Sequence, residues 1–521
     1  MTRIVVMKIT YAAAVAAIVA GMATAFAPPV QAAASCESLA ALALPNTTIT
    51  AVQAVAAGGF TPLTPLGGRG APPAAVSLPA FCRVAATLKP SSDSDIKIEV
   101  WLPSAGWNGK FQGVGNGGWT GSINYGALSQ ALRNGYATAS TDTGHEGGSG
   151  QFALGHPEKL VDFGWRAVHE MTVQAKSVVN AFYGSAPQRS YWVGCSSGGK
   201  QGLKEAQKFP ADYDGIVAGA PANYWTHLVT QSLWVAQATL KDPASTIPRE
   251  KYAVIHDAAL AQCDARDGVR DGVIEDPARC QFDPKKLLCS NGDGPSCLTA
   301  PQVAAAQKIY APAKNPRTGQ EIFPGLAVGS EKGWAALAGG PRPLSIADDH
   351  YKFVVFKNPE WDFRTLDFDK DLELADRIDR DFELNANDPN LQAFAARGGK
   401  ILMYHGWNDQ LISPVNSIKY LKSVESALGG PAKAADLMRL FMVPGMAHCA
   451  GGDGTSSFDM LKALEQWVEQ RQRPVRIVAS RFENDKLVRT RPLCPYPQVA
   501  TYKGTGSIDQ ADSFLCALVR H

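Results

Sequence analysis

The sequence has almost no net charge with which to attract a charged partner. Its 50 Lys and Arg residues and 48 Asp and Glu residues leave a formal charge of +2 over 521 residues. Proteins that recruit nucleic acid or an anionic membrane through their overall field carry a clear basic excess. The composition therefore excludes both partner classes and favours a small substrate with little or no charge.

Long apolar segments are also missing after the N-terminus, and we find no internal repeat of solenoid or propeller length. The N-terminus differs, because Arg3 and Lys8 precede an alanine-rich apolar stretch over residues 11–27 and small residues follow it. This order predicts a signal peptide over residues 1–34, removed on export to the periplasm or the medium, with no membrane contact afterwards. An uncleaved membrane anchor is the alternative.

Cys-x-x-Cys motifs, which supply most structural zinc sites, do not occur. All ten cysteines follow the leader, and an even number of cysteines in an exported chain predicts disulfides. Spacing alone leaves their connectivity open. Three pairs are favoured by proximity along the chain: Cys263 with Cys280, Cys289 with Cys297, and Cys494 with Cys516.

Strand and helix patterns alternate in two parts of the chain, which is typical of a largely parallel sheet with crossover helices. Between these parts, residues 223–388 hold four cysteines and many prolines and aromatics without clear alternation. We interpret 35–222 and 389–521 as one α/β catalytic domain, and 223–388 as an inserted lid domain. The expected strands cover 82–88, 96–102, 109–114, 136–140, 191–193, 215–218, 399–404 and 439–443, and the expected helices cover 165–182, 199–208, 415–428 and 457–470.

The most informative motif is Gly-Cys-Ser-Ser-Gly at residues 194–198, directly after an expected strand. Gly-x-Ser-x-Gly between a strand and a helix is the pattern of a nucleophile elbow, whose sharp turn needs small residues and exposes the serine hydroxyl. Ser196 has glycine two residues before and two residues after it, whereas Ser197 does not. Ser196 is therefore the expected nucleophile, and a Cys195 thiolate is disfavoured because it lies off the apex.

An acid and a base follow in the chain order of the α/β-hydrolases, Ser then Asp or Glu then His. Asp409 follows the strand expected at 399–404, and His448 follows the strand expected at 439–443. His405 is the main alternative base, but it precedes the acid and would break this order. A turn-forming role is the simpler alternative for Asp409.

Two cysteines adjoin the expected catalytic residues. Cys195 precedes Ser196, and Cys449 follows His448. If serine and histidine lie within hydrogen-bond reach, the two cysteines lie close enough for a disulfide that limits drift between the two loops. Two independent buried thiols are the alternative.

A glycine-rich loop over residues 115–119 follows an earlier expected strand. An oxyanion hole needs one N–H from the residue after the nucleophile and one from such a loop. We therefore expect the N–H groups of Ser197 and Gly117 to bind the oxyanion, with Gly118 as the alternative to Gly117. A merely flexible glycine loop is the competing interpretation.

Three aspartates, Asp264, Asp267 and Asp271, lie in a short glycine-containing loop. Hard carboxylate oxygens suit Ca²⁺, but the spacing is not that of an EF-hand and no glutamate closes the loop. Ordinary polar turns explain these residues equally well.

Together these motifs resemble the tannase and feruloyl esterase family, over essentially the whole mature chain. The resemblance implies an α/β-hydrolase core with a large lid, acting on esters of aromatic acids. It implies that Ser196 is the nucleophile, Asp409 the acid and His448 the base. The segments that carry the resemblance are 194–199, 405–409, 444–449 and 491–497.

The resemblance also implies a structural Ca²⁺ ion in the lid and a full set of disulfides. The ligands would be the side chains of Asp264, Asp267 and Asp271 and the main-chain carbonyls of Val269 and Val273. The implied disulfides are Cys36–Cys82, Cys195–Cys449, Cys263–Cys280, Cys289–Cys297 and Cys494–Cys516.

We expect a secreted or periplasmic serine esterase. The resemblance implies feruloyl, galloyl or related phenolic-acid esters as its substrates, with terephthalate monoesters as the alternative. A non-catalytic polyphenol- or carbohydrate-binding protein on a hydrolase scaffold is the alternative of another class, and the intact Ser, Asp and His argue against it. The oligomeric state stays open. Several lid aromatics are candidates for contact with the substrate ring, although ordinary lid core is the simpler account of most: Tyr351, Phe353, Phe356, Trp361 and Phe363.

Overall fold

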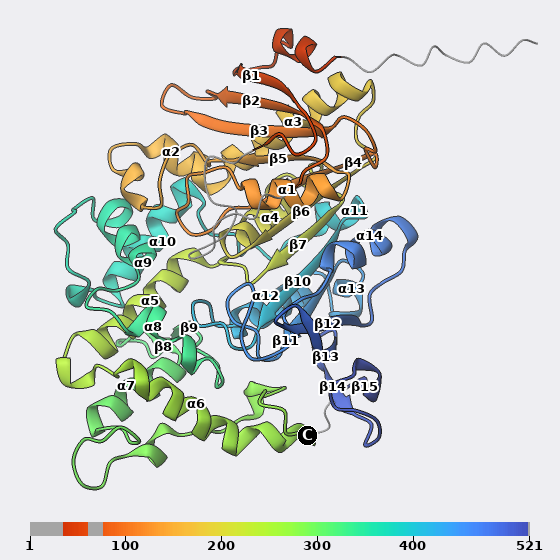
Figure 1. Cartoon of the computed structure of the whole chain (residues 1–521). Helices are drawn as coiled ribbons and strands as arrows, with labels where there is room; N and C mark the ends of the chain where they lie inside the picture. Colours follow the sequence, from red (N-terminus) through yellow and green to blue (C-terminus); the bar gives the residue numbers. More distant parts are fainter. Residues whose placement is uncertain (1–34, 61–76, 519–521) are drawn as a thin grey trace, which may run out of the picture.

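The computed structural model describes residues 35–60 and 77–518, so the predicted signal peptide over 1–34 lies outside the described residues. In the described chain, a nine-stranded mixed sheet forms the centre of the molecule (Figure 1). Its strand order is β1-β2-β3-β5-β4-β6-β7-β10-β11. These strands are β1 (Thr47–Val55), β2 (Phe81–Leu88), β3 (Ile96–Pro103), β4 (Lys110–Val114), β5 (Ala137–Thr141), β6 (Arg189–Cys195), β7 (Gly215–Gly219), β10 (Lys400–Gly406) and β11 (Met438–Val443).

The sheet is antiparallel at one edge and parallel over the rest. Strands β1, β2, β3 and β5 pair antiparallel, whereas β5, β4, β6, β7, β10 and β11 pair parallel. The carboxyl ends of the parallel strands therefore meet at one edge, where the loops after β4, β6, β10 and β11 emerge. Ligand sites of open α/β sheets form at this edge.

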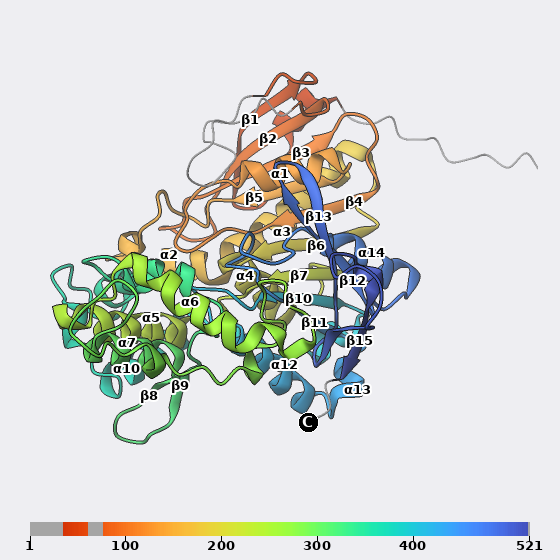
Figure 2. The ribbon, with the colours of Figure 1, turned by 60° about the horizontal axis from the view of Figure 1, so that its bottom comes forward.

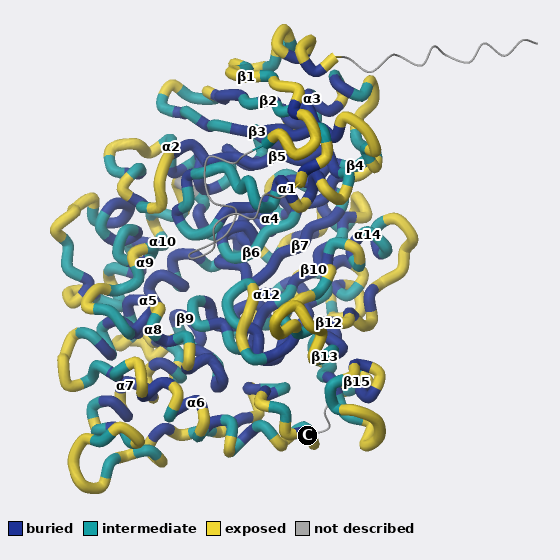
Figure 3. Tube along the Cα trace, viewed as in Figure 1, coloured by how far each residue is buried: buried dark blue, intermediate teal, exposed yellow. Residues whose placement is uncertain are grey.

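Helices cover both faces of the sheet because side chains alternate along each strand. Ile401 and Met403 of β10 share an apolar cluster with α3 (Ala167–Tyr183), α4 (Ser197–Lys208) and α12 (Val415–Ala427). Leu402 between them packs in another cluster with α1 (Tyr125–Arg133) and α14 (Met460–Gln470). Figure 3 shows the central strands as buried and the outer helices as partly exposed. The predicted α/β class is confirmed, with all twelve expected elements present within a few residues.

A large helical segment lies between β7 and β10 in the chain, over residues 220–399. It contains its own apolar cluster, built around Val235, Ile255 and Trp334. Figures 1 and 2 both place the helices between residues 225 and 382 to one side of the sheet, whereas the last helix before β10 packs in the cluster of the sheet itself. The predicted lid at 223–388 falls within this segment, and closure over a substrate stays a prediction. The elements are α5 (Trp225–Leu240), α6 (Arg249–Cys263), α7 (Ala300–Tyr310), β8 (Ala313–Lys314), β9 (Glu321–Phe323), α8 (Ala335–Ala338), α9 (Ser345–Asp349), α10 (Lys370–Phe382) and α11 (Gln392–Ala396).

The lid aromatics that were candidates for ring contact mostly form core. Tyr351 is fully buried, and Phe353 and Phe363 are at most 9% exposed. Trp361 stacks on both Tyr351 and Phe356, whose own rings are tilted to each other, in the cluster that contains α5. The simpler account, ordinary lid core, therefore holds for these side chains.

Two hairpins follow the sheet and were not expected from the sequence. They are β12 (Ile477–Glu483) with β13 (Lys486–Leu493), and β14 (Gln498–Tyr502) with β15 (Phe514–Leu518). The Cys494–Cys516 disulfide joins them. No helix among residues 35–60 and 77–518 is long and apolar enough to cross a membrane.

Candidate active site

Ser196 sits at a strained turn between β6 and α4. Its φ of 62° and ψ of −121° lie in a region that residues with a Cβ rarely adopt, at a cost of about 1–3 kcal/mol. Main-chain hydrogen bonds hold the turn: Ser196 N–H donates to Gly219 O (2.9 Å), and Lys200 N–H donates to Ser196 O (3.0 Å). The side chain is left half-buried at the N-terminus of α4, where an anion is stabilised by free N–H groups.

Close main-chain packing explains the glycines around this serine. A Cβ on Gly194 would lie 2.4 Å from Gly198 O, and a Cβ on Gly199 would lie 2.5 Å from Gly219 O. Real Cβ atoms do not approach oxygen this closely, so neither position admits a side chain. The steric reason for the elbow motif is therefore visible in the structure.

Asp409 and His448 meet at the carboxyl ends of β10 and β11. His448 donates through Nδ1 to Asp409 Oδ2 at 2.7 Å. The other oxygen of this carboxylate accepts the N–H groups of Leu411 (2.8 Å) and Ile412 (2.9 Å). Asp409 is fully buried, whereas the His448 side chain is 14% exposed. Asp409 thus fixes the orientation of the His448 imidazole from its buried side, and the opposite edge of the ring is accessible to a substrate.

A second imidazole, that of His405, contacts the same carboxylate. Its Nε2 lies 3.1 Å from both Asp409 Oδ2 and Ile412 O, and its Nδ1 lies 2.7 Å from Ser417 Oγ. Burial alone would raise the pKa of Asp409, but the two imidazoles hold it well below its usual range. Because His405 is fully buried and both its nitrogens are engaged, it positions Asp409 and cannot act as the base. Sequence reasoning treated it only as a competing base.

The loops that carry Ser196 and His448 are joined by a disulfide. Cys195 and Cys449 are bonded, with their Cα atoms 6.0 Å apart and 254 residues between them in the chain. In the described part of the chain Ser196 Oγ has no hydrogen-bond partner, so its approach to His448 Nε2 stays a prediction. The other four disulfides pair the cysteines as the family resemblance implies: Cys36–Cys82, Cys263–Cys280, Cys289–Cys297 and Cys494–Cys516.

The expected oxyanion donors lie on two segments that are tied together. Ser197 Oγ donates to Gly118 O (3.0 Å), and Asn116 N–H donates to Gln201 Oε1 (3.1 Å). A Cβ on Gly117 would meet nothing within 4 Å, so this residue borders open space. The glycine loop is therefore fixed beside the elbow, as an oxyanion hole requires. The assignment of the Ser197 and Gly117 N–H groups as donors stays a prediction.

The inserted segment holds the loop that follows His448. His256 of α6 lies between Glu331 (Nδ1 to Oε2, 2.8 Å) and Asp453 (Nε2 to Oδ2, 3.5 Å), and Lys332 Nζ is 3.2 Å from the same Asp453 oxygen. In addition, His448 N–H donates to Gln410 Oε1 (3.2 Å). The contacts of Asp453 thus tie the loop after His448 to the inserted segment, and the Gln410 contact ties His448 to the loop after β10.

The aspartate loop packs against the same region from another side. Asp264 accepts the N–H groups of Asp271 (3.2 Å) and Gly272 (3.1 Å), and Asp267 accepts the N–H of Val269 (2.9 Å). Burial, with the neighbouring carboxylates, raises the pKa of Asp267 to about 6. Val273 packs against Gly445: a Cβ built on Gly445 would lie 3.1 Å from Val273 Cγ1. The loop thus supports the turn that precedes His448.

We predict that Asp409→Asn lowers kcat by about 10³–10⁴-fold. The amide cannot stabilise a positively charged His448 imidazole, while the fold around the site is retained. Steady-state kinetics on any cleaved ester measures the effect. Asp162→Asn is the matched control, because Asp162 is a fully buried carboxylate of the same domain paired with Arg166. A kcat for Asp409→Asn within about tenfold of the wild type would contradict the assignment.

We predict that the double variant Cys195→Ala, Cys449→Ala loses both stability and turnover. Removing a native disulfide costs about 2–5 kcal/mol, and freeing the two loops lowers kcat about tenfold or more. Thermal unfolding and kinetics measure the two effects. The control is Cys289→Ala, Cys297→Ala, whose disulfide closes only a short loop in the inserted segment. Wild-type kcat in the first double variant would show that the bridge does not position the catalytic residues.

The family model for tannase and feruloyl esterase matches residues 82–517 of this chain. An uncharacterized esterase of Xanthomonas campestris pv. campestris is 41% identical, over 93% of this chain and 91% of the relative. A probable feruloyl esterase B-2 of Aspergillus fumigatus is 35% identical, over 84% of this chain and 86% of the relative.

A solved structure shows the same fold along nearly the whole chain. The crystal structure of feruloyl esterase B from Aspergillus oryzae has a TM-score of 0.85 and 32% identity, and the match covers 92% of this chain and 99% of that one. The predicted α/β-hydrolase fold is confirmed by this likeness. The chain therefore belongs to the tannase and feruloyl esterase family and is a carboxylic ester hydrolase.

Proposed function

We propose that this protein is a serine esterase that hydrolyses esters of phenolic acids. The observation that carries the proposal is the His448–Asp409 pair, held by the Cys195–Cys449 disulfide beside the strained Ser196 turn. The names of the related feruloyl esterases support the substrate class.

The first half of the reaction forms an acyl-enzyme. Ser196 Oγ attacks the ester carbonyl carbon while His448 Nε2 takes the hydroxyl proton, and Asp409 stabilises the resulting imidazolium. The carbonyl oxygen becomes negative and is held by the N–H groups of Ser197 and Gly117. The tetrahedral intermediate then collapses, and the alcohol leaves with the proton from His448.

The second half reverses these roles. A water molecule gives a proton to His448 Nε2 and attacks the acyl carbon, and a second oxyanion forms in the same place. Collapse breaks the bond to Ser196 Oγ, which recovers the proton. The phenolic acid is released and the free serine is regenerated.

We also propose that the protein is exported to the periplasm or the medium. Its five disulfides need an oxidising compartment to form and persist. The leader-like sequence over residues 1–34 supports the same destination.

We propose further that the loop from Asp264 to Val273 binds a structural Ca²⁺ ion. The donor types fit: Asp264, Asp267 and Asp271 supply three carboxylates, and within the described residues the carbonyls of Val269 and Val273 accept no hydrogen bond. The three carboxylates do not lie within 4.8 Å of one another in the structure, so the ion would draw them together. Oxygen-only ligation suits Ca²⁺. Arg489 and Arg491 form ion pairs with Asp271, and the ion would neutralise the carboxylates of Asp264 and Asp267.

We predict that methyl ferulate is cleaved with a kcat/KM about tenfold or more above that of an aliphatic methyl ester. Methyl gallate and a terephthalate monoester complete the panel and rank the aromatic acids. Hydrolysis of aliphatic esters alone would overturn the aromatic assignment.

We predict that Ser196→Ala lowers kcat about 10³-fold or more. The control Ser197→Ala keeps its main-chain N–H and should lose far less activity. Full activity of Ser196→Ala would overturn the assignment of Ser196 as the nucleophile.

We predict that a chelator lowers the unfolding temperature by a few degrees or more, and that Ca²⁺ but not Mg²⁺ restores it. Asp267→Asn should abolish this response because it removes one ligand. Asp257→Asn, an exposed aspartate on α6, is the control and should respond like the wild type. Identical unfolding of the wild type with and without chelator would contradict the calcium assignment.

A further inference from the structure

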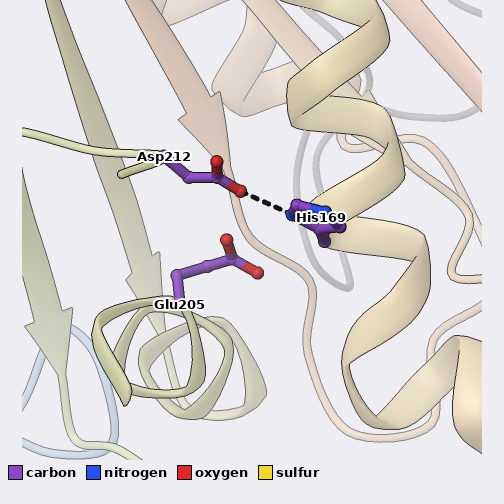
Figure 4. A group of neighbouring side chains, drawn as sticks. All are labelled: His169, Glu205 and Asp212. Atoms are coloured by element: carbon purple, nitrogen blue, oxygen red, sulfur yellow. Dashed lines mark hydrogen bonds and ion pairs between the residues drawn. The ribbon is translucent and has the colours of Figure 1, made fainter. Parts of the chain in front are cut away.

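A second group of ligating side chains lies between α3 and α4, away from the catalytic loops. It consists of His169 on α3, Glu205 on α4 and Asp212 in the turn before β7 (Figure 4). One ligand atom from each residue lies within 4.8 Å of the other two. Over residues 35–60 and 77–518 this is the one such group of three or more His, Cys, Asp or Glu side chains.

Glu205 is the residue that needs an explanation. It is 1% exposed, and neither carboxylate oxygen has a hydrogen-bond partner in the described chain. Figure 4 shows its carboxylate beside that of Asp212, with the His169 ring next to both. Burying a carboxylate without partners is costly. Burial, followed by the charge of Asp212, raises the pKa of Glu205 well above its usual value.

The neighbouring charges leave this carboxylate unsatisfied. His169 donates through Nδ1 to Asp212 Oδ2 at 2.7 Å, which does not involve Glu205. The ammonium of Lys176 is close, but it donates to the main-chain oxygen of Asp212 rather than to a carboxylate. The charge of Lys176 acts on Glu205, but no cation of the described chain is hydrogen-bonded to this carboxylate. Two carboxylates and an imidazole thus converge around an acid that has no hydrogen-bond partner.

The group is also built to admit and hold an ion. The His169 side chain is 25% exposed and the Asp212 side chain 13% exposed, so a hydrated ion can enter from that side and keep water ligands. Phe209 stacks on the His169 ring with centroids 3.7 Å apart, which fixes the plane of the imidazole. Supported ligands of this kind are typical of metal sites.

We propose that His169, Glu205 and Asp212 bind a divalent transition-metal ion, with Zn²⁺ as the best fit to one nitrogen and two carboxylate donors. The imidazole ligand argues against Ca²⁺ and Mg²⁺, which prefer oxygen donors only. The ion would fasten α4, the helix that begins directly after Ser196, to α3. Its role is structural, and it is independent of the calcium loop and of the esterase chemistry.

The test uses the full mature chain without a polyhistidine tag, stripped with a chelator and then saturated with Ca²⁺. Zn²⁺ is titrated by calorimetry, and Co²⁺ absorption spectra report its coordination. We expect one equivalent of Zn²⁺ and a higher unfolding temperature in its presence. Glu205→Gln and His169→Gln should each weaken Zn²⁺ binding about tenfold or more, whereas Asp257→Asn, at an exposed position on α6, should bind it normally.

Glu205→Gln keeps the side-chain shape and removes a buried charge, so its metal-free form should be at least as stable as the wild type. Unfolding of the metal-free variants therefore separates loss of a ligand from misfolding. Absence of Zn²⁺ binding by the wild type, or equal binding by wild type and both variants, would overturn the proposal. Glu205 would then be a neutral acid that shares a proton with Asp212.

Discussion

The arrangement of the active site depends on the disulfide between Cys195 and Cys449. Strands β6 and β11 are three positions apart in the sheet, roughly 14 Å at ordinary strand spacing, yet the two bridged Cα atoms are 6.0 Å apart. Because Cys195 is the last residue of β6, the loop after β11 must reach across the ends of β10 and β7. This convergence brings together the loops that carry Ser196 and His448, the proposed nucleophile and base, and the inserted segment leaves the sheet between them.

The buried carboxylate of Asp409 fixes the orientation of the His448 imidazole. Asp409 receives two main-chain N–H groups and two imidazoles, so its carboxylate cannot rotate and stays ionised. His405 is enclosed by Ser417 and Ile412, and only His448 faces outward. The same oxygen thus contacts one buried histidine and one partly exposed histidine. Their different burial, rather than their chemistry, makes His448 the proposed base.

Much of this site could be predicted from the sequence because its signals are local. Each signal lies within a few residues of a strand end: the elbow glycines, the residues Ser196, Asp409 and His448, and the adjoining cysteines. The order of the three residues along the chain is a further signal. The role of His405 and the group around Glu205 depend on contacts between distant segments, which spacing does not show. The role of the lid aromatics could not be assigned from the sequence, because aromatic side chains occur both in protein cores and on the walls of substrate cavities. The terminal hairpins are short and partly exposed, so their apolar pattern is weak.

The central claim is that one serine, Ser196, becomes acylated during turnover. Titration with a 4-nitrophenyl phosphonate, followed by peptide mass spectrometry, tests it most directly because such reagents trap an activated serine. The account predicts one equivalent of nitrophenol, loss of esterase activity in proportion, and a single adduct on the peptide that contains Ser196. Loss of activity with the adduct on another residue, or full activity of the labelled enzyme, would contradict the account.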